Sequence, residues 1–211
     1  MGGAAHGSLN KEEDAMLTRF RDFYERVTIP FGKASIKLRL TPNMWTLISF
    51  LCSVAAGILI AQGQFLGGIF MVLAMNLADM MDGATARAGG TGTTFGTVLD
   101  HVTDRYAEFF VVGGLMAGGW ISPVLGLFAA SGIVMASYVR AKAESVGVKK
   151  CVVGLAGRQE KLILMYGGLL FFSVQLALIG QVLIFLAGAI SHITAAQRLL
   201  YAQEQLLGSN R

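Results

Sequence analysis

The chemistry of this chain is concentrated in one segment, Asp79-Met80-Met81-Asp82-Gly83-Ala84-Thr85-Ala86-Arg87. The continuation of this segment has a further pair of carboxylates, Asp100 and Asp104, four residues apart after Gly96. Residues three or four apart share one face of an α-helix, so each pair predicts two carboxylates on one face. The intervening Gly89-Gly90-Thr91-Gly92 is typical of a tight reversal. Two antiparallel helices are therefore expected to direct four carboxylates toward one another.

Four carboxylates in a low-dielectric site are unstable unless positive charge lies among them. Hard divalent cations prefer oxygen ligands, which favours Mg²⁺ or Mn²⁺ over softer metals. Scattered interhelical salt bridges are the structural alternative, but clusters of ionisable residues inside membranes are usually functional. We therefore expect one or two ions of Mg²⁺ or Mn²⁺ at this site, and we favour two. The expected ligands are Asp79, Asp82, Asp100 and Asp104.

The composition of the chain is that of a membrane protein. Of its 211 residues, 54% are hydrophobic and only 14% are charged, which is too few charges for an ordinary soluble domain. A spanning helix needs roughly 20 apolar residues. We predict an all-α integral membrane bundle of six transmembrane helices, which occupy residues 43–62, 65–88, 95–117, 120–143, 160–179 and 181–200.

The N-terminal segment has a different pattern, because residues 11–36 alternate charges with an apolar stripe at helical spacing. This pattern favours an amphipathic helix that lies in the membrane interface and ends at Pro30 and Gly32. A cytoplasmic helix packed on the bundle is the alternative interpretation. The predicted domains are a cytoplasmic segment over 1–40, the six-span domain over 41–205, and a tail over 206–211.

The basic residues are unevenly distributed among the predicted connections. The expected connections around Gly63, Gly119 and Gly180 contain no Lys or Arg. By the positive-inside rule, both termini and the aspartates are expected to face the cytoplasm of a multi-pass cell-membrane protein. The same distribution argues against nucleic acid as a partner, since the cations are juxtamembrane and divided among loops. The basic residues on the other side include Lys33, Lys37, Arg39, Arg140, Lys142, Lys149, Lys150, Arg158 and Lys161.

The complete spacing of the central segment is Asp-x2-Asp-Gly-x2-Ala-Arg-x8-Gly-x3-Asp-x3-Asp, from Asp79 to Asp104. This pattern resembles the motif of the CDP-alcohol phosphotransferases, enzymes that join a CDP-linked alcohol to a second alcohol and release CMP. The resemblance implies a CDP-lipid donor, an alcohol acceptor, a membrane-lipid environment and a homodimer. It also implies that the Thr-Pro-Asn start of the first span lies beside the nucleotide.

Five residues are candidate nucleotide contacts. Thr41 and Pro42 begin the first span as N-cap and first helical residue, and capping alone explains both. Gly83 lets a nucleotide approach the backbone, and Arg87, one turn further, can meet the diphosphate or an aspartate. Thr93 can cap the third span, while the resemblance implies a nucleotide contact near it. The full set is Pro42, Asn43, Gly83, Arg87 and Thr93.

Cations from three predicted helices gather at their cytoplasmic ends. Topology alone explains most loop cations, but some of these residues lie within or beside apolar helix, where topology does not require them. A convergent group of this kind binds an anion such as phosphate. The candidate acceptor contacts are Arg140, Lys142, Arg158, Lys161 and Arg198.

The residues around these cations narrow the resemblance. The segments 138–144 (Tyr-Val-Arg-Ala-Lys-Ala-Glu) and 158–161 (Arg-Gln-Glu-Lys), with Gln197-Arg198, look like the phosphatidylinositol-phosphate synthases and their archaeal counterparts. The fifth span starts Gly157-Arg158 where the family usually has Glu-Arg. The resemblance implies transfer of a phosphatidyl or archaetidyl group from a CDP-lipid to inositol 1-phosphate, an acceptor that already carries a phosphate.

We expect a direct, metal-assisted displacement in which Asp104 is the general base, because it lies one turn beyond Asp100. Three alternatives stay open from the sequence. Glycerol 3-phosphate is the acceptor in a phosphatidylglycerol-phosphate synthase, and CDP-inositol is the donor in a synthase of a soluble product. A cation-coupled transporter is the alternative of another class, although no inverted repeat is visible and the charges lie on one side.

Overall fold

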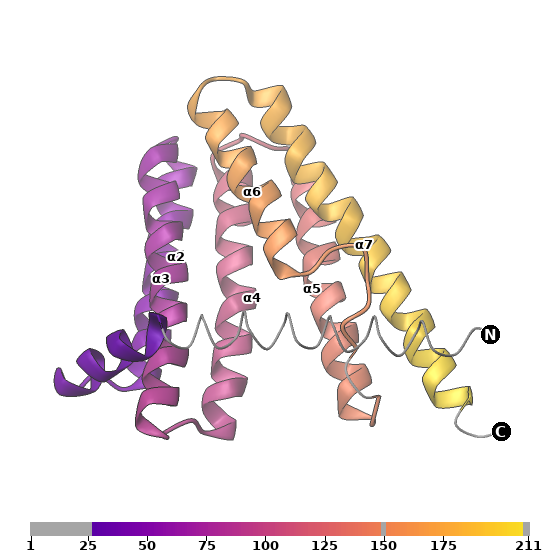
Figure 1. The fold of residues 1–211 in the computed structure, drawn as a ribbon. Coiled ribbons are helices and arrows are strands. Elements are labelled where there is room, and N and C mark those ends of the chain that lie inside the picture. Colours follow the sequence, from indigo (N-terminus) through magenta and orange to yellow (C-terminus); the bar gives the residue numbers. More distant parts are fainter. Residues whose placement is uncertain (1–26, 149–150, 209–211) are drawn as a thin grey trace, which may run out of the picture. The chain divides into compact units, whose positions relative to one another are not determined.

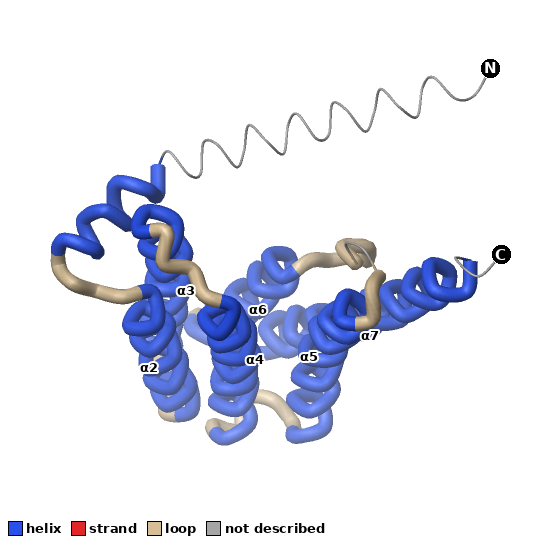
Figure 2. Tube along the Cα trace, turned by 90° about the horizontal axis from the view of Figure 1, so that it is seen from below, coloured by secondary structure: helices blue, strands red, loops and turns tan. Residues whose placement is uncertain are grey.

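The computed structural model describes residues 27–148 and 151–208, and these residues form helices joined by short connections, without strands (Figure 2). The all-α prediction is therefore confirmed for the described part of the chain. A helix over residues 27–37 comes first. It is followed by α2 (Pro42–Ala61), α3 (Phe65–Gly89), α4 (Thr94–Ala117), α5 (Pro123–Ser145), α6 (Arg158–Ser173) and α7 (Ala177–Gly208).

Four of these helices, α2, α3, α5 and α7, are long and apolar enough to cross a membrane. This finding agrees with a multi-pass membrane protein. The other two fall short for different reasons, because α6 has only 16 residues and α4 carries four charged side chains. Those four are Asp100, Asp104, Arg105 and Glu108. The count of six spans stays a prediction.

Local hydrogen bonds explain where α2 and α4 begin. The Thr41 hydroxyl accepts a hydrogen bond from the Met44 N–H at 3.3 Å, and α2 starts at Pro42, as the sequence predicts. The Thr93 hydroxyl caps α4 in the same way, accepting from the Gly96 N–H at 2.9 Å. The predicted reversal between α3 and α4 is also confirmed. Gly90 turns the chain there with a φ of 60°, a conformation that glycine adopts without strain.

The connection between the last two helices lies earlier than predicted. Helix α6 ends at Ser173 and α7 begins at Ala177, so the expected turn around Gly180 is wrong. Gln175 makes the turn instead, with a φ of 64°. A Cβ on Gly180 would lie 2.8 Å from the Phe172 ring, so this glycine serves close helix packing and not chain reversal.

The helix over residues 27–37 continues through Pro30 and Gly32, so the prediction that these residues end it is wrong. Gly32 packs directly on the carbonyl of Ala84, which leaves no space for a side chain and explains the glycine. The chain leaves the helix at Arg39, whose φ is 58°. Residues 11–26 of the predicted amphipathic stripe lie outside the described residues, and the interfacial helix stays a prediction.

The contacts divide the chain into two compact units. Among the described residues, the first unit contains 27–49 and 75–102, and the second contains 50–74 and the described residues from 103 onward. Within the second unit, α7 packs against both α5 and α6, and Figure 1 shows α6 and α7 joined by their short turn. The helices α2, α3 and α4 contribute residues to both units.

Candidate functional site

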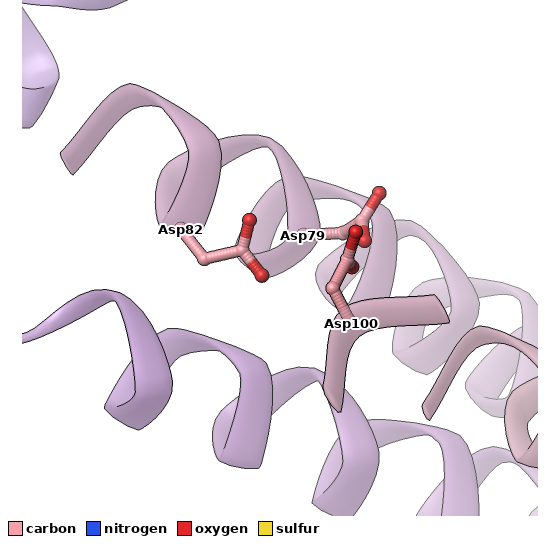
Figure 3. A group of neighbouring side chains, drawn as sticks. All are labelled: Asp79, Asp82 and Asp100. Atoms are coloured by element: carbon pink, nitrogen blue, oxygen red, sulfur yellow. The ribbon is translucent and has the colours of Figure 1, made fainter. Parts of the chain in front are cut away.

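Three of the four predicted metal ligands meet in the first unit. Asp79 and Asp82 on α3 and Asp100 on α4 each offer an oxygen, and these oxygens lie within 4.8 Å of one another (Figure 3). At that separation each pair of charges repels by about 3 kcal/mol at an effective dielectric of about 20. A divalent cation removes this repulsion, and a set of carboxylate oxygens is the donor set that Mg²⁺ and Mn²⁺ prefer. The residues present therefore fit such an ion. We call them the carboxylate cluster.

Asp82 is the most enclosed member of the carboxylate cluster, with 9% of its surface exposed. The hydroxyl of Thr46 donates a hydrogen bond to Asp82 Oδ2 at 3.0 Å, which fixes the orientation of this carboxylate. Sequence reasoning did not assign Thr46 to the site. The available signal was its spacing, because Thr46 lies one helical turn after Pro42 and Asn43 and shares their face.

A pocket of about 130 Å³ adjoins the carboxylate cluster within the first unit. Both Asp82 and Asp100 line it, so a ligand in the pocket reaches the proposed metal ligands. The pocket also contains four of the five predicted nucleotide contacts, Pro42, Asn43, Gly83 and Thr93.

The fifth predicted nucleotide contact, Arg87, lies over Gly83. Its guanidinium Nη1 is 3.0 Å from the position that a Cβ on Gly83 would take. Gly83 therefore leaves the space that this guanidinium occupies, beside the pocket that Gly83 itself lines. A cation held beside a carboxylate-lined pocket suits the diphosphate of a nucleotide.

Asp104 belongs to the second unit, where its surroundings differ from those of the carboxylate cluster. It is 9% exposed, and Arg158 donates a hydrogen bond to its Oδ1. The Arg105 guanidinium lies 3.8 Å from its other oxygen. Arg105 also donates to Glu108 at 2.6 Å and to Ser137 at 2.7 Å. Asp104 is thus held between two guanidinium groups.

Lys161 completes this group of charges. It is 3% exposed, and its charge interacts with those of Glu108, Arg105 and Arg158. We call Asp104, Arg105, Glu108, Arg158 and Lys161 the charged network. Sequence reasoning did not assign Arg105 or Glu108 to the site, although both lie within one turn of Asp104 on α4.

The other three predicted acceptor contacts are placed differently. Arg198 is 6% exposed, and it donates to the carbonyls of Val153 at 3.0 Å and Ala136 at 2.7 Å. Arg140 and Lys142 are exposed on α5, and Arg140 pairs with Glu144 one turn away at 3.0 Å. Of the five predicted cations, Lys161 and Arg198 are therefore buried, Arg158 is partly buried, and Arg140 and Lys142 are exposed.

Comparison with known proteins identifies the family of the chain. The family model described as CDP-alcohol phosphatidyltransferase matches residues 39–195. The chain belongs to this family. The match includes the whole carboxylate cluster, its pocket and all five residues of the charged network. Members of the CDP-alcohol phosphatidyltransferase family are transferases, so this chain is an enzyme and the transporter alternative is wrong.

Two curated relatives extend the similarity over nearly the full chain. The archaetidylinositol phosphate synthase of Methanothermobacter thermautotrophicus is 33% identical, and the alignment covers 92% of this chain and 97% of that protein. The phosphatidylinositol phosphate synthase of Mycobacteroides abscessus is 34% identical over 85% of this chain and 84% of that protein. Both resemble this chain at a level that indicates a shared family.

Solved structures give the same result for the fold. The Mycobacterium tuberculosis phosphatidylinositol phosphate synthase with CDP-DAG bound has a TM-score of 0.75 at 30% identity, covering 84% of this chain and 94% of that chain. The structure of that enzyme in complex with manganese and citrate has the same TM-score and identity, over 83% and 88% of the two chains.

Proposed function

We propose that this transferase moves the phosphatidyl or archaetidyl group of a CDP-lipid to inositol 1-phosphate and releases CMP. The observation that carries the acceptor assignment is the balance of the charged network, in which three cations enclose two carboxylates. The surplus positive charge suits an anionic acceptor, since an enclosed charge without compensation is costly. The names of the similar synthases support the same acceptor class.

The carboxylate cluster and its pocket serve the donor in this proposal. Asp79, Asp82 and Asp100 hold Mg²⁺ or Mn²⁺, and Asp104 is retained as a candidate ligand of a second ion. A bound divalent ion of this kind polarises the phosphoryl oxygens and neutralises the leaving CMP. The pocket residues Asn43 and Thr93 orient the nucleotide, while Arg87 offers a cation to the diphosphate.

The charged network serves the acceptor. Arg158 and Lys161 bind the phosphate of the acceptor, and Asp104 takes the proton from the attacking hydroxyl. Arg158 is the link between the two roles, because its guanidinium already bonds to Asp104. An incoming phosphate competes for this guanidinium, and Asp104 becomes the better proton acceptor as its share of the positive charge falls. Proton transfer is thereby coupled to the presence of the acceptor.

The distribution of the basic residues supports a proposal for the location of the protein. We infer a multi-pass cell-membrane enzyme with both termini and the site on the cytoplasmic side, because Lys and Arg avoid the opposite connections. In this arrangement α4 and α6 complete a bundle of six spans. We also propose that the protein forms a homodimer, as the resemblance to the family implies.

One assay tests the acceptor. Purified protein receives a CDP-lipid and Mn²⁺ with inositol 1-phosphate, glycerol 3-phosphate, serine or no acceptor, and CMP release is measured. We expect release above the background rate with inositol 1-phosphate only. Preference for glycerol 3-phosphate would replace the inositol assignment with the phosphatidylglycerol-phosphate alternative. CMP release with serine but with neither phosphorylated acceptor would contradict the proposal that the acceptor carries a phosphate.

A further inference from the structure

The loop that leads into α6 is held on α7 by side chains of α7. The Leu155 N–H donates a hydrogen bond to Gln197 Oε1 at 2.7 Å, and the Ala156 N–H donates to the Thr194 hydroxyl at 3.3 Å. A buried backbone N–H outside a helix needs such a partner, and α7 supplies one to the buried Ala156 N–H, while the bond to Leu155 is exposed. Thr194 and Gln197 are three residues apart, so they present one face of α7 to this loop.

Further contacts fix the same loop. Arg198 donates to the carbonyl of Val153, and Gly154 packs directly on Thr194 with no space for a side chain. Cys151 is fully buried, and its cluster combines residues of α5, the loop and α7. The other members of this cluster are Ala143, Val148 and Ala202, with Val153 and Tyr201 packed against them. The loop is therefore docked by polar contacts at one end and apolar packing at the other.

The docked loop leads directly to a residue of the charged network. Helix α6 begins at Arg158, two residues after Ala156. Gly157 precedes it as N-cap and offers no side-chain capping bond, so the start of α6 depends on how the loop is anchored. Arg158 then reaches Asp104. The chain from Thr194 through Ala156 to Arg158 is continuous and lies within the second unit.

We propose that Thr194 and Gln197 are positioning residues that dock the loop over residues 151–157 on α7 and thereby hold Arg158 in place for the phosphorylated acceptor. This inference rests on the proposed function, in which Arg158 binds the acceptor phosphate. Neither side chain has an ionisable group. In this proposal both affect acceptor binding indirectly, because they hold the backbone of the loop that precedes Arg158. Loss of either acceptor atom leaves a backbone N–H of the loop without its partner and loosens the start of α6.

Kinetics test the positioning role. Thr194→Val and Gln197→Leu keep side-chain volume but remove the accepting oxygen. We expect each to raise KM for inositol 1-phosphate by about three- to tenfold, the effect of one lost hydrogen bond, without a matching change in KM for the CDP-lipid. Thr194→Ser and Gln197→Glu keep an accepting oxygen and should restore the parent KM. Gln205→Leu, at an exposed position on α7, is the matched control.

Alkylation of Cys151 measures the docking without any turnover. Cys52 and Cys151 are free thiols, so a Cys52→Ser background leaves Cys151 as the only target in the chain. Burial shields Cys151 and raises the pKa of its thiol, so alkylation is slow while the loop is docked. In this background, Thr194→Val and Gln197→Leu should accelerate the reaction of folded protein with a maleimide, and the Ser and Glu variants should not.

The two readouts separate this inference from the proposed function. Unchanged alkylation in both variants would overturn the docking role. Faster alkylation with an unchanged KM, or an equal rise in both KM values, would overturn the positioning of Arg158. If the parent protein prefers glycerol 3-phosphate, the proposed acceptor is wrong, and the same KM comparison is made with that phosphorylated acceptor. A selective rise in its KM would then support the positioning role, while an unchanged KM would overturn it.

Discussion

The carboxylate cluster and the charged network handle charge in opposite ways. The cluster brings three carboxylates of one sign within 4.8 Å, whereas the network alternates carboxylates with guanidinium and ammonium groups. A group of like charges requires a ligand of the opposite sign, but a network of alternating charges is largely compensated without one. This difference supports our proposal that the first region binds a divalent cation and that the second, with its one surplus positive charge, binds an anionic acceptor.

Helix α4 contributes to both regions. Asp100 belongs to the cluster and Asp104 to the network, one helical turn later. Two chemically identical side chains therefore have different neighbours: the carboxylates of Asp79 and Asp82 lie near Asp100, and guanidinium groups hold Asp104. This contrast gives a matched pair of substitutions on a single helix.

The largest expected effects come from this pair. Asp100→Asn should reduce CMP release by about a thousandfold, because it removes a ligand from a site whose ion supplies several kcal/mol. Asp104→Asn should reduce kcat by about a hundredfold or more through loss of the general base, with CDP-lipid binding retained. Both losses are measured as initial rates of CMP release in the presence of Mn²⁺. A preceding test shows that EDTA abolishes the activity of the parent protein.

Direct Mn²⁺ binding distinguishes the two regions. Asp100→Asn should weaken binding measured by electron paramagnetic resonance, and Asp104→Asn should leave at least one ion bound at the parent affinity. Glu204→Gln, on the exposed surface of α7, serves as the control for removal of a negative charge. Equal loss of Mn²⁺ binding in both aspartate variants would contradict the contrast between the two regions, because Asp104 would then belong to the cation site.

A second comparison lies within the predicted acceptor contacts. Arg158 is partly buried and bonded to Asp104, whereas Arg140 is exposed and paired with Glu144. Arg158→Ala should raise KM for inositol 1-phosphate by about ten- to a hundredfold, the contribution of a charged hydrogen bond. Arg140→Ala should raise it by no more than about threefold, as expected of an exposed ion pair.

Steady-state rates at varied acceptor and fixed CDP-lipid measure these values. KM for the CDP-lipid is the internal control, since neither substitution touches the carboxylate cluster. An effect of Arg140→Ala as large as that of Arg158→Ala would show that burial does not decide which cations bind the acceptor.

Periodicity and spacing were sufficient for much of the fold. The aspartate spacing predicted that α3 and α4 present carboxylates to each other, and the glycine-rich segment predicted the reversal at Gly90. These predictions succeeded because helical periodicity and glycine conformation are local properties. The caps at Thr41 and Thr93 were predictable for the same reason.

The errors arose where contacts distant in sequence decide the outcome. Gly180 and Gly32 were both predicted to interrupt a helix, yet each lies inside one. Another part of the chain packs closely against each of these glycines, which explains why the position has no side chain. The turn between α6 and α7 uses Gln175, a residue without a turn signature. The ion pair between Asp104 and Arg158, which are 54 residues apart, could not be predicted either, since sequence spacing does not tell which distant charged side chains form an ion pair.

The smallest expected effect concerns the support of the carboxylate cluster. Thr46 donates a hydrogen bond to Asp82, and residues that orient metal ligands contribute to metal affinity without binding the ion. Thr46→Val keeps the shape of the side chain but removes the donor. We expect the Mn²⁺ concentration for half-maximal activity to rise by about tenfold. The rate at saturating Mn²⁺ should stay close to that of the parent protein.

Thr46→Ser is the matched control, because it retains the hydroxyl and should keep the parent metal dependence. Two alternatives would give different results. If Thr46 acts mainly through the pocket that it also lines, Thr46→Val would raise KM for the CDP-lipid at saturating Mn²⁺. If its only contribution is to the start of α2, through its bond to the Pro42 carbonyl, thermal stability would fall with the metal dependence unchanged. A selective change in metal dependence, reversed by serine, therefore assigns the hydroxyl to the carboxylate cluster.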